Sequence, residues 1–236
     1  MHATQYISGT MWPLFLAFGI IGIILAVLGF IIATEGRYFG KRLIRWGYNR
    51  RSVTFEVRDD WELWEHLIQR LRIEPSERLL DLGTQTGHFP RLVARQRGFR
   101  GEIVGIDWSE EMIQEAQRQA RLEGTQNRIR FLCRDVQQPL PFQKNTFTLV
   151  TVVTGLLNGV KSSETLFEEI QRVLRPYGRV AFRFTPQALG YSPIRKAEWL
   201  VTRLAPFGFQ YIETLSWTPT HEILIFRLSE PGEIDT

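Results

Sequence analysis

The 236-residue chain has almost no cysteine and shows no internal repeat or low-complexity tract. Cys133 is the only cysteine, so the chain cannot form an intramolecular disulfide or a cysteine-based zinc cluster. This usage suits a reducing compartment. None of the four histidines stands at metal-ligand spacing or in a Ser-His-Asp arrangement. The sequence therefore predicts no metal site and no hydrolase triad.

Charge is missing from the start of the chain. The first acidic or basic residue is Glu35, and the chain from Trp12 to Ala33 is apolar. A helix of roughly 22 residues is about 33 Å long, which is enough to cross the hydrocarbon core of a bilayer. A signal peptide would start with basic residues and carry a small-x-small cleavage site, and a buried core helix is rarely so long without polar residues. The pattern predicts one membrane span in an N-terminal segment, residues 1–34.

Residues 35–58 are predicted to form a basic juxtamembrane linker. Between residues 35 and 51, six lysines and arginines oppose one acid and alternate with aromatic and aliphatic residues. Each cation contributes about 1 kcal/mol on an anionic lipid surface, and the positive-inside rule places the following domain in the cytoplasm. The linker is either a tether on the headgroups or part of an entrance for a lipid-soluble substrate. We expect membrane lipid to be a partner.

The rest of the chain is close to neutral, because the five excess positive charges of residues 35–51 exceed the net charge of +4 for the whole chain. A nucleic-acid-binding domain concentrates positive charge on one face. We therefore expect no nucleic-acid partner, and the composition leaves the oligomeric state open.

Residues 59–236 alternate between strand and helix patterns, which is typical of an α/β domain. The expected strands are residues 78–82, 102–107, 128–134, 147–153, 179–184, 209–217 and 222–228. The expected helices begin after Asp59 or Asp60, and then cover residues 89–97, 109–122, 162 or 163 to 174, and 193–204. The short connection between the last two strands makes them an antiparallel pair. The pattern predicts a mostly parallel, doubly wound sheet that binds ligands at the carboxyl ends of its strands.

The stretch Leu79 to Gly87, LLDLGTQTG, has the layout of a strand, a tight loop and a helix start. Glycines in such a loop let a ligand approach the bare backbone at a helix N-terminus. An ordinary strand-to-helix turn that binds no ligand would show the same sequence pattern. A nicotinamide dehydrogenase is disfavoured, because its Gly-x-Gly-x-x-Gly loop is absent.

Four motifs in order resemble the class I S-adenosylmethionine-dependent methyltransferases, from about Asp59 to Leu228. They are LLDLGTQTG, VGIDWSEEMI from Val104, FLCRDVQQPLPF from Phe131 and EIQRVLRPYGRV from Glu169. The chain looks most like the small-molecule branch that includes the ubiquinone/menaquinone biosynthesis methyltransferases. The resemblance implies a Rossmann-like seven-stranded methyltransferase sheet with a C-terminal antiparallel hairpin, and S-adenosyl-L-methionine as the cofactor.

The resemblance also implies roles for individual residues. Asp107, 20 positions after Gly87, would take the ribose hydroxyls, unless it only caps a helix. Asp135 would accept from the adenine amino group, with the Val136 N–H nearby, unless it only forms a turn. Trp108 would pack on the ribose or adenine, or lie on the surface.

The methionine end of the cofactor would lie at the glycine loop. The residues assigned to it are Asp81, Gly83, Gln85 and Gly87. Gln85 stands where the family has a middle glycine, and its side chain could crowd the methionine. Thr148 stands where the family often has an acid that supports the loop. Pro176-Tyr177-Gly178 replaces the family's Pro-Gly-Gly turn.

Methyl transfer needs alignment and a dry pocket more than it needs a strong base. Catalytic or substrate-contacting candidates are Thr154 and Asn158, near Thr151 after the fourth strand, and His88, which could instead be a solvated residue of a first helical turn. Tyr191 could help to close the pocket. The sequence thus favours a membrane-anchored methyltransferase for a lipid-soluble or small-molecule acceptor. The alternative is a membrane-tethered binding or scaffold protein on a degenerate methyltransferase fold.

Overall fold

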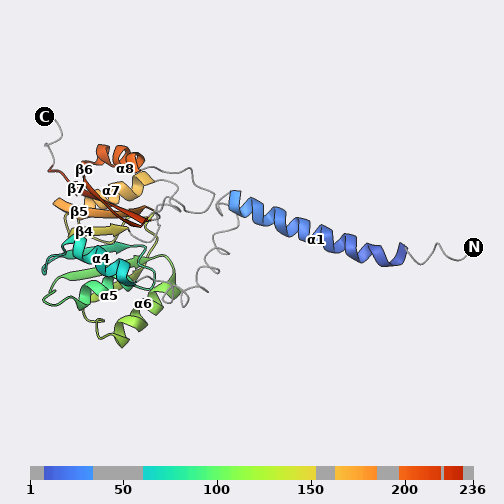
Figure 1. The fold of residues 1–236 in the computed structure, drawn as a ribbon, viewed down its shortest axis with the longest axis horizontal. Coiled ribbons are helices and arrows are strands. Elements are labelled where there is room, and N and C mark those ends of the chain that lie inside the picture. The colour runs from blue at the N-terminus through green and yellow to red at the C-terminus, as the bar shows by residue number, and fades with distance from the viewer. Residues whose placement is uncertain (1–7, 34–60, 153–162, 185–196, 219–220, 231–236) are drawn as a thin grey trace, which may run out of the picture. The chain divides into compact units, whose positions relative to one another are not determined.

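A computed structural model describes residues 8–33, 61–152, 163–184, 197–218 and 221–230 of the chain. The chain divides into two compact units, residues 1–48 and 49–236. The first unit holds helix α1, Ser8–Ala33 (Figure 1). Its window Pro13–Phe30 has a mean hydropathy of 2.6 and no buried side chain, so α1 is long and apolar enough to cross a membrane.

The second unit is built on a seven-stranded sheet. Its strand order is β3-β2-β1-β4-β5-β7-β6. The strands are β1 Arg78–Leu82, β2 Glu102–Asp107, β3 Ile129–Cys133, β4 Phe147–Val152, β5 Leu174–Phe184, β6 Phe209–Thr218 and β7 His221–Leu228. Strands β1 to β5 are parallel, whereas β7 runs antiparallel to both β5 and β6. This confirms the predicted sheet with its antiparallel hairpin.

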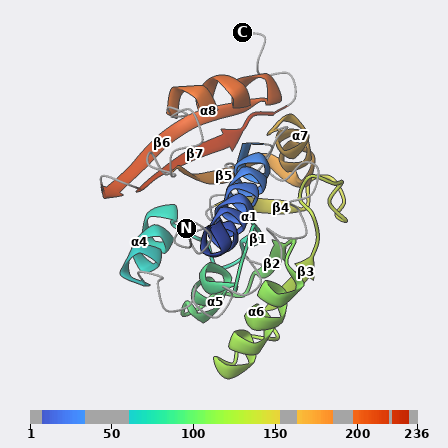
Figure 2. The ribbon, with the colours of Figure 1, turned by 90° about the vertical axis from the view of Figure 1, so that its right-hand side faces the viewer.

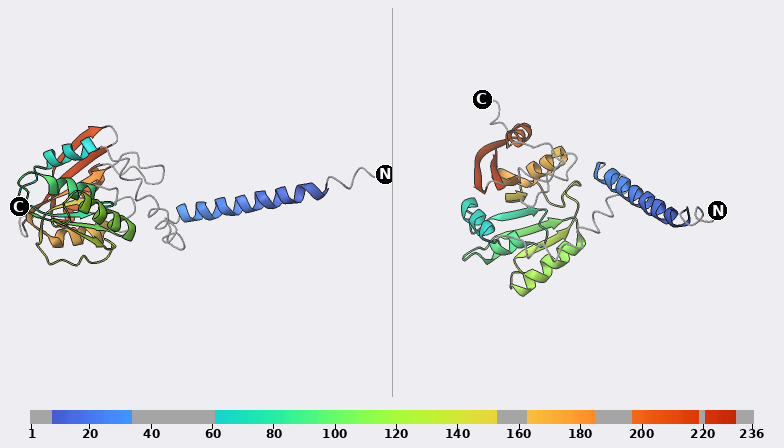
Figure 3. Two further views of the ribbon diagram at one scale, coloured as in Figure 1. Left: turned by 90° about the horizontal axis from the view of Figure 1, so that it is seen from below. Right: turned by 45° about the vertical axis from the view of Figure 1, so that its right-hand side comes forward.

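Helices cover both faces of this sheet (Figures 2 and 3). They are α4 Trp61–Leu71, α5 His88–Arg95, α6 Glu110–Leu122, α7 Ser163–Val173 and α8 Ala197–Leu204, with a short 3₁₀ turn, Ala205–Phe207. Apolar residues of α4, α5 and α6 form one core cluster, and those of α7 and α8 form the other. Leu79 joins the first cluster and Leu80 the second, as alternation along a buried strand requires.

Local signals fix several of these boundaries. Ser109 caps α6 by accepting a hydrogen bond from the Met112 N–H at 3.2 Å, and Met112 is fully buried. Helix α5 ends two residues before the predicted position, because Gln96 is already extended, with a ψ of 134°. Strand β5 begins five residues early, because Leu174 pairs with Phe147 before a register shift. The predicted caps Asp59 and Asp60 lie outside the described residues.

The parallel register gives the sheet two distinct edges. At the amino edge, where strands begin, Arg78 pairs with Glu102. At the carboxyl edge, where strands end, Leu82 pairs with Ile106, and Asp107 pairs with Cys133. Ligands of doubly wound sheets bind at the carboxyl edge, so a cofactor site is expected at this edge.

Candidate cofactor site

The loop after β1 alternates left-handed and ordinary backbone. Gly83, Gln85 and Gly87 have φ values of 73°, 52° and 74°. The Thr84 N–H donates to the Ile106 carbonyl at 2.8 Å, which ties the loop to β2. The loop therefore turns back over the end of the neighbouring strand before α5 begins.

Two glycines are required here by space, and Gly87 is required by its dihedral angle as well. A Cβ built on Gly87 would lie 2.6 Å from Cε1 of Phe131, and one on Gly105 would lie 2.8 Å from Oγ1 of Thr84. Gly87 thus combines a left-handed φ with a contact that leaves no room for a side chain. The neighbours that exclude a side chain are protein atoms, so the predicted approach of a cofactor to Gly87 stays a prediction.

Gln85 adopts a backbone conformation that is typical of glycine. Its φ of 52° places a non-glycine residue in the left-handed region, at a cost of roughly 1–2 kcal/mol. Its N–H donates to Oδ2 of Asp107 at 3.0 Å. The middle position of the loop is therefore held by the same carboxylate that the sequence assigns to the ribose.

Asp107 ends β2 and is 1% exposed. Its Oδ1 accepts the Ser109 N–H at 2.9 Å, and Ser109 is itself the helix cap, so Asp107 is not the capping residue. Burial raises the pKa of Asp107 to about 6, although the N–H groups of Ser109 and Gln85 oppose the shift. Each carboxylate oxygen has a second lone pair with which to accept a ribose hydroxyl.

Asp81 lies in β1, just before the loop, and is also 1% exposed. The Thr151 hydroxyl donates to its Oδ1 at 2.6 Å, and the Thr84 hydroxyl lowers its pKa without reaching hydrogen-bond geometry. Burial nevertheless raises the pKa of Asp81 to about 7. Among the described residues, Oδ2 has no hydrogen-bond partner. A buried carboxylate oxygen left in this state suits the ammonium group of a methionine moiety.

In β4 the support of the loop acid comes from Thr151 and not from Thr148. Thr151 is fully buried and bound to Asp81, so it supports the loop acid and does not face a substrate. Thr148 lies at the amino edge, where its hydroxyl accepts the Arg78 N–H at 2.9 Å. It cannot support the glycine loop from there. Which of the two threonines lies near the loop depends on the alternation and register of β4, and the sequence alone does not fix these.

The predicted adenine residues follow β3. Asp135 is exposed, and its Oδ1 accepts the Gln137 N–H at 3.0 Å, so it forms the turn that the sequence analysis held as the alternative. Val136 is 5% exposed, and Trp108 after β2 is half-buried. Because β2 and β3 are neighbours in the sheet, these residues follow adjacent strand ends. A turn-forming Asp keeps its second carboxylate oxygen available to a ligand.

His88 is not a fully solvated residue of the first helical turn, which was the alternative interpretation for it. It is half-buried at the start of α5, its ring centroid lies 6.0 Å from that of Trp64, and its Nδ1 lies 3.4 Å from Nη2 of Arg91. The other catalytic candidates, Thr154 and Asn158, and also Tyr191, lie outside the described residues. They stay predictions.

Arg91 is a residue that sequence reasoning missed. It is 1% exposed, and its Nη1 donates to the Thr86 carbonyl of the loop at 3.3 Å. Its Nε lies 3.4 Å from a carboxylate oxygen of Glu123, at the end of α6. In the sequence, Arg91 looks like one more charged residue of a polar helix. A buried arginine can be recognised only once its partners are known.

The chain is similar in sequence to known proteins. A family model described as a methyltransferase domain matches residues 79–178. A demethylmenaquinone methyltransferase from Lactiplantibacillus plantarum is 32% identical over 151 residues, covering 61% of this chain and 62% of that protein. The chain spans about three fifths of the length of the curated relatives it matches.

Solved structures agree on the fold. A SAM dependent methyltransferase from Aquifex aeolicus superposes with a TM-score of 0.63 at 18% identity, over 73% of this chain and 95% of that one. The [4+2]-cyclase SpnF gives the same TM-score at 21% identity, over 73% of this chain and 84% of that one. At these identities the likeness concerns the fold alone.

The sheet order, the glycine loop and its two buried carboxylates agree with the family match over the same residues. Residues 79–178 of this chain therefore form a methyltransferase domain of the class I S-adenosylmethionine-dependent type, whose cofactor is S-adenosylmethionine.

Proposed function

We propose that this protein is a membrane-anchored, S-adenosylmethionine-dependent methyltransferase that acts on a lipid-soluble acceptor. The observation that carries the enzymatic part is the pair of buried carboxylates, Asp81 and Asp107, on either side of the glycine loop. Each is 1% exposed, and burial raises the pKa of both. Ionised carboxylates are costly in such a place unless a ligand uses them.

Different residues would bind different parts of the cofactor. Asp107 would accept the ribose hydroxyls, Asp81 would face the methionine ammonium, and Asp135 and Val136 would receive the adenine. S-adenosylmethionine supplies a methyl group on a positively charged sulfur. The acceptor's nucleophilic atom forms a bond to that carbon as the carbon–sulfur bond breaks, S-adenosylhomocysteine leaves, and the acceptor loses a proton. The protein contributes alignment and exclusion of water.

The proposed acceptor class is supported by α1 and by the relatives. An apolar helix whose side chains in residues 13–30 are all exposed is unstable in water and is stabilised by a bilayer. The matched relative from Lactiplantibacillus plantarum carries the name demethylmenaquinone methyltransferase. A quinone-type or other lipid-soluble acceptor is consistent with both.

A second function is favoured by one residue, Gln85, whose side chain occupies the middle of the loop. A protein of this fold need not transfer methyl groups, since a [4+2]-cyclase shares it. The alternative is a membrane-tethered binding protein that holds the cofactor without turnover.

One experiment separates the two. Full-length protein in vesicles is incubated with S-adenosylmethionine labelled on its methyl group and with a membrane lipid extract. We expect label in the lipid fraction for the wild type and none for Asp107→Ala. Cofactor binding without label in any lipid, protein or RNA fraction would support the binding protein instead.

A further inference from the structure

The loop that carries the predicted adenine residues connects β3 to β4 without a helix. It leaves β3 at the carboxyl edge and enters β4 at the amino edge, because both strands belong to the parallel part of the sheet. At its start the Arg134 N–H donates to the Asp107 carbonyl at 2.8 Å, and in the turn that follows the Gln138 N–H donates to the Asp135 carbonyl at 3.1 Å. The turn that would meet the adenine thus belongs to no helix or strand.

Two side chains of α7 bind the backbone of this loop at Leu140. Oε2 of Glu169 accepts the Leu140 N–H at 2.6 Å, and Nη2 of Arg172 donates to the Leu140 carbonyl at 3.0 Å. Nη1 of Arg172 donates to the Phe142 carbonyl at 2.6 Å. Leu140 is 4% exposed, and a buried backbone outside regular structure needs such partners. Helix α7 therefore fixes the middle of the loop.

Glu169 and Arg172 also hold each other in place. Nε and Nη2 of Arg172 donate to the two carboxylate oxygens of Glu169, each at 2.7 Å. A bidentate pair of this kind fixes geometry as well as charge. The hydrogen bond from Arg172 lowers the pKa of the Glu169 carboxyl below its usual value, so the pair is ionised at neutral pH. The helix beneath the pair is anchored in the core by Leu166, Phe167, Ile170 and Val173.

Prolines stiffen the segment between this anchor and the turn. Pro139 and Pro141 flank Leu140. Their rings fix φ and remove two N–H donors, and each proline restricts the residue before it to extended backbone. Only Pro139 separates Leu140 from the turn of residues 135–138. A displacement of Leu140 would therefore be transmitted to Asp135.

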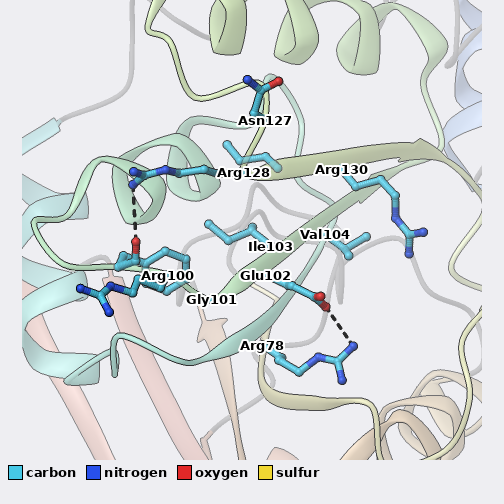
Figure 4. Close-up of a pocket in the computed structure, with 11 residues that line it drawn as sticks. Arg78, Arg100, Gly101, Glu102, Ile103, Val104, Asn127, Arg128 and Arg130 are labelled. Carbon is cyan, nitrogen blue, oxygen red and sulfur yellow. Dashed lines mark hydrogen bonds and ion pairs between the residues drawn. The ribbon is translucent and has the colours of Figure 1, made fainter.

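The far end of the loop is held by aromatic packing beside a basic pocket. The Phe142 ring packs edge-on against Phe147 at the start of β4, with centroids 4.9 Å apart, and the Arg130 guanidinium lies 5.6 Å from the Phe142 ring. Arg130 lines a pocket of about 620 Å³ at the amino edge (Figure 4). The described lining has one acid, Glu102, and four arginines, Arg78, Arg100, Arg128 and Arg130. Their guanidinium groups point apart, so they do not converge on one anion.

We infer that Glu169 and Arg172 are positioning residues of the cofactor site, which fix the loop so that Asp135 and the Val136 N–H meet the adenine. The inference rests on the proposed function, because the adenine contacts belong to it. Neither side chain touches the cofactor in this account. They act through Leu140 and the stiff segment before it.

The consequence of this positioning is base specificity. Oδ1 of Asp135 accepts the Gln137 N–H at 3.0 Å, which leaves the other carboxylate oxygen for the amino group of adenine. Hypoxanthine carries a carbonyl oxygen in place of that amino group, and a carboxylate repels it. A site that places an acceptor at the amino group rejects the analogue that lacks the donor. The preference for adenine over hypoxanthine therefore reports how well the loop is placed.

A role in stability alone is the rival interpretation, and this preference separates the two. A variant that is only less stable binds both ligands less, in proportion to its folded fraction, so the ratio of the two dissociation constants does not change. A misplaced loop lowers the ratio itself.

The experiment is calorimetric titration of the full-length protein in detergent with S-adenosylhomocysteine and with S-inosylhomocysteine. We expect the wild type to prefer the adenine ligand by about tenfold or more, as a hydrogen bond to a charged group allows. Asp135→Ala and Glu169→Ala should each lose most of this preference. Glu169→Gln should keep most of it, because the amide oxygen can still accept the Leu140 N–H.

Two double variants test the pathway. Glu169→Arg with Arg172→Glu keeps an ion pair on α7 but turns donors toward the Leu140 N–H and acceptors toward the carbonyls, so the preference should stay lost. Adding Asp135→Ala to Glu169→Ala should change the ratio no further, because the contribution of Asp135 is already absent. A further fall as large as in the wild-type background would show that the residues act independently, and would overturn the inference.

A second pair supplies the matched control. Glu115 and Arg118 of α6 have the same spacing and the same bidentate contact, at 2.7 and 2.6 Å, in an exposed position. Glu115→Ala should keep the wild-type preference. An equal loss of preference in Glu115→Ala would contradict a specific role for the α7 pair.

The outcomes distinguish this inference from the proposed function. A wild type that binds neither ligand would overturn both. Tight binding of S-adenosylhomocysteine without a preference over S-inosylhomocysteine would overturn the adenine contacts and the positioning with them. A wild-type preference that survives in Glu169→Ala, with only the midpoint of urea unfolding lowered, would overturn the positioning role and leave the cofactor site intact.

Discussion

Gln85 decides at the residue scale whether the glycine loop can accept its ligand. The residue has a left-handed backbone, and its N–H is bound to Asp107 at 3.0 Å. Two effects of a non-glycine residue at this position can be separated. One is the energetic cost of the left-handed φ, which is a backbone effect. The other is any crowding of the methionine, which is an effect of the side chain.

Replacing Gln85 should tighten cofactor binding. Gln85→Gly removes both the crowding and a left-handed cost of roughly 1–2 kcal/mol, whereas Gln85→Ala removes only the crowding. Calorimetric titration with S-adenosylmethionine should show tighter binding for both variants. Tighter binding in Gln85→Gly alone would assign the effect to the backbone, and unchanged or weaker binding in both would show that the side chain does not crowd the site.

Cofactor affinity should fall as the pH is lowered. In the ligand-free protein burial raises the pKa of Asp107 to about 6 and that of Asp81 to about 7. The ionised carboxylates are the forms that accept hydroxyls and face the ammonium, so protonation competes with binding. The dissociation constant should therefore rise by about tenfold per pH unit for each acid once the pH is below its pKa. Titrations from pH 5 to pH 8 measure this slope. Asp107→Asn should bind more weakly and lose the part of the slope that begins near pH 6, and a flat wild-type profile would contradict the assignment.

At the scale of elements, α5 carries a polar link from the loop to the residue that follows α6. Arg91 contributes to it from a fully buried position, through the Thr86 carbonyl and the Glu123 carboxylate. Arg95 approaches the same Glu123 at 3.8 Å from an exposed position. The two arginines share one partner and differ in burial.

Arg91→Met should destabilise the domain much more than Arg95→Met. Removing one member of a buried charged pair leaves the other uncompensated, so we expect a loss of about 2–3 kcal/mol for Arg91→Met, somewhat below the range for fully buried pairs because Glu123 is partly exposed. An exposed pair contributes at most about 1 kcal/mol. Urea unfolding of both variants gives the two values, and a similar loss for both would show that Arg91 does not hold the loop.

The elements themselves were predictable from the sequence. Strands β1 and β2 have the predicted bounds, and the Ser109 cap fixes the start of α6, because these segments obey local rules of periodicity and capping. Motif and spacing singled out Gly87 and Asp107, and the structure places Gly87 in the loop and Asp107 at the end of β2. Local signals sufficed wherever a residue's role depends on its near neighbours in the chain.

Roles that depend on register were not predictable. Thr148 and Thr151 are three residues apart on one strand, and only pairing with β1 shows that Thr151 meets Asp81 while Thr148 meets Arg78. The contact of His88 with Trp64 joins two elements separated by β1. Such contacts follow from tertiary packing, which periodicity does not encode.

At the scale of the whole molecule, folding sorts a nearly neutral domain into edges of different character. Four arginines gather at the amino-edge pocket, while Asp81, Asp107 and Asp135 gather toward the carboxyl edge. This arrangement could not be predicted from the net charge, because charged residues that are far apart in the sequence come together only through the parallel register of the strands. The first turn of α4 lies at the carboxyl edge, where the cofactor site lies.

Deleting residues 1–33 should separate membrane attachment from cofactor binding. The truncated protein should no longer float with vesicles, and its methylation of a lipid-embedded acceptor should fall strongly. Its affinity for S-adenosylmethionine should not change, because the loop and its carboxylates belong to the second unit. Replacing residues 8–33 by an unrelated apolar helix should restore both properties. Undiminished methylation of lipid acceptor by the truncated protein would show that α1 is not needed for access.

The central claim is that the loop of residues 83–87 and Asp107 form an S-adenosylmethionine site. Calorimetric titration of the full-length protein with S-adenosylmethionine or S-adenosylhomocysteine tests it most directly, in the wild type and in Asp107→Ala. We predict saturable binding by the wild type and a loss of at least tenfold in affinity for Asp107→Ala, since the variant lacks the charged hydrogen-bond acceptor for the ribose. No heat from the wild type at millimolar ligand, or equal affinity in both proteins, would contradict the account.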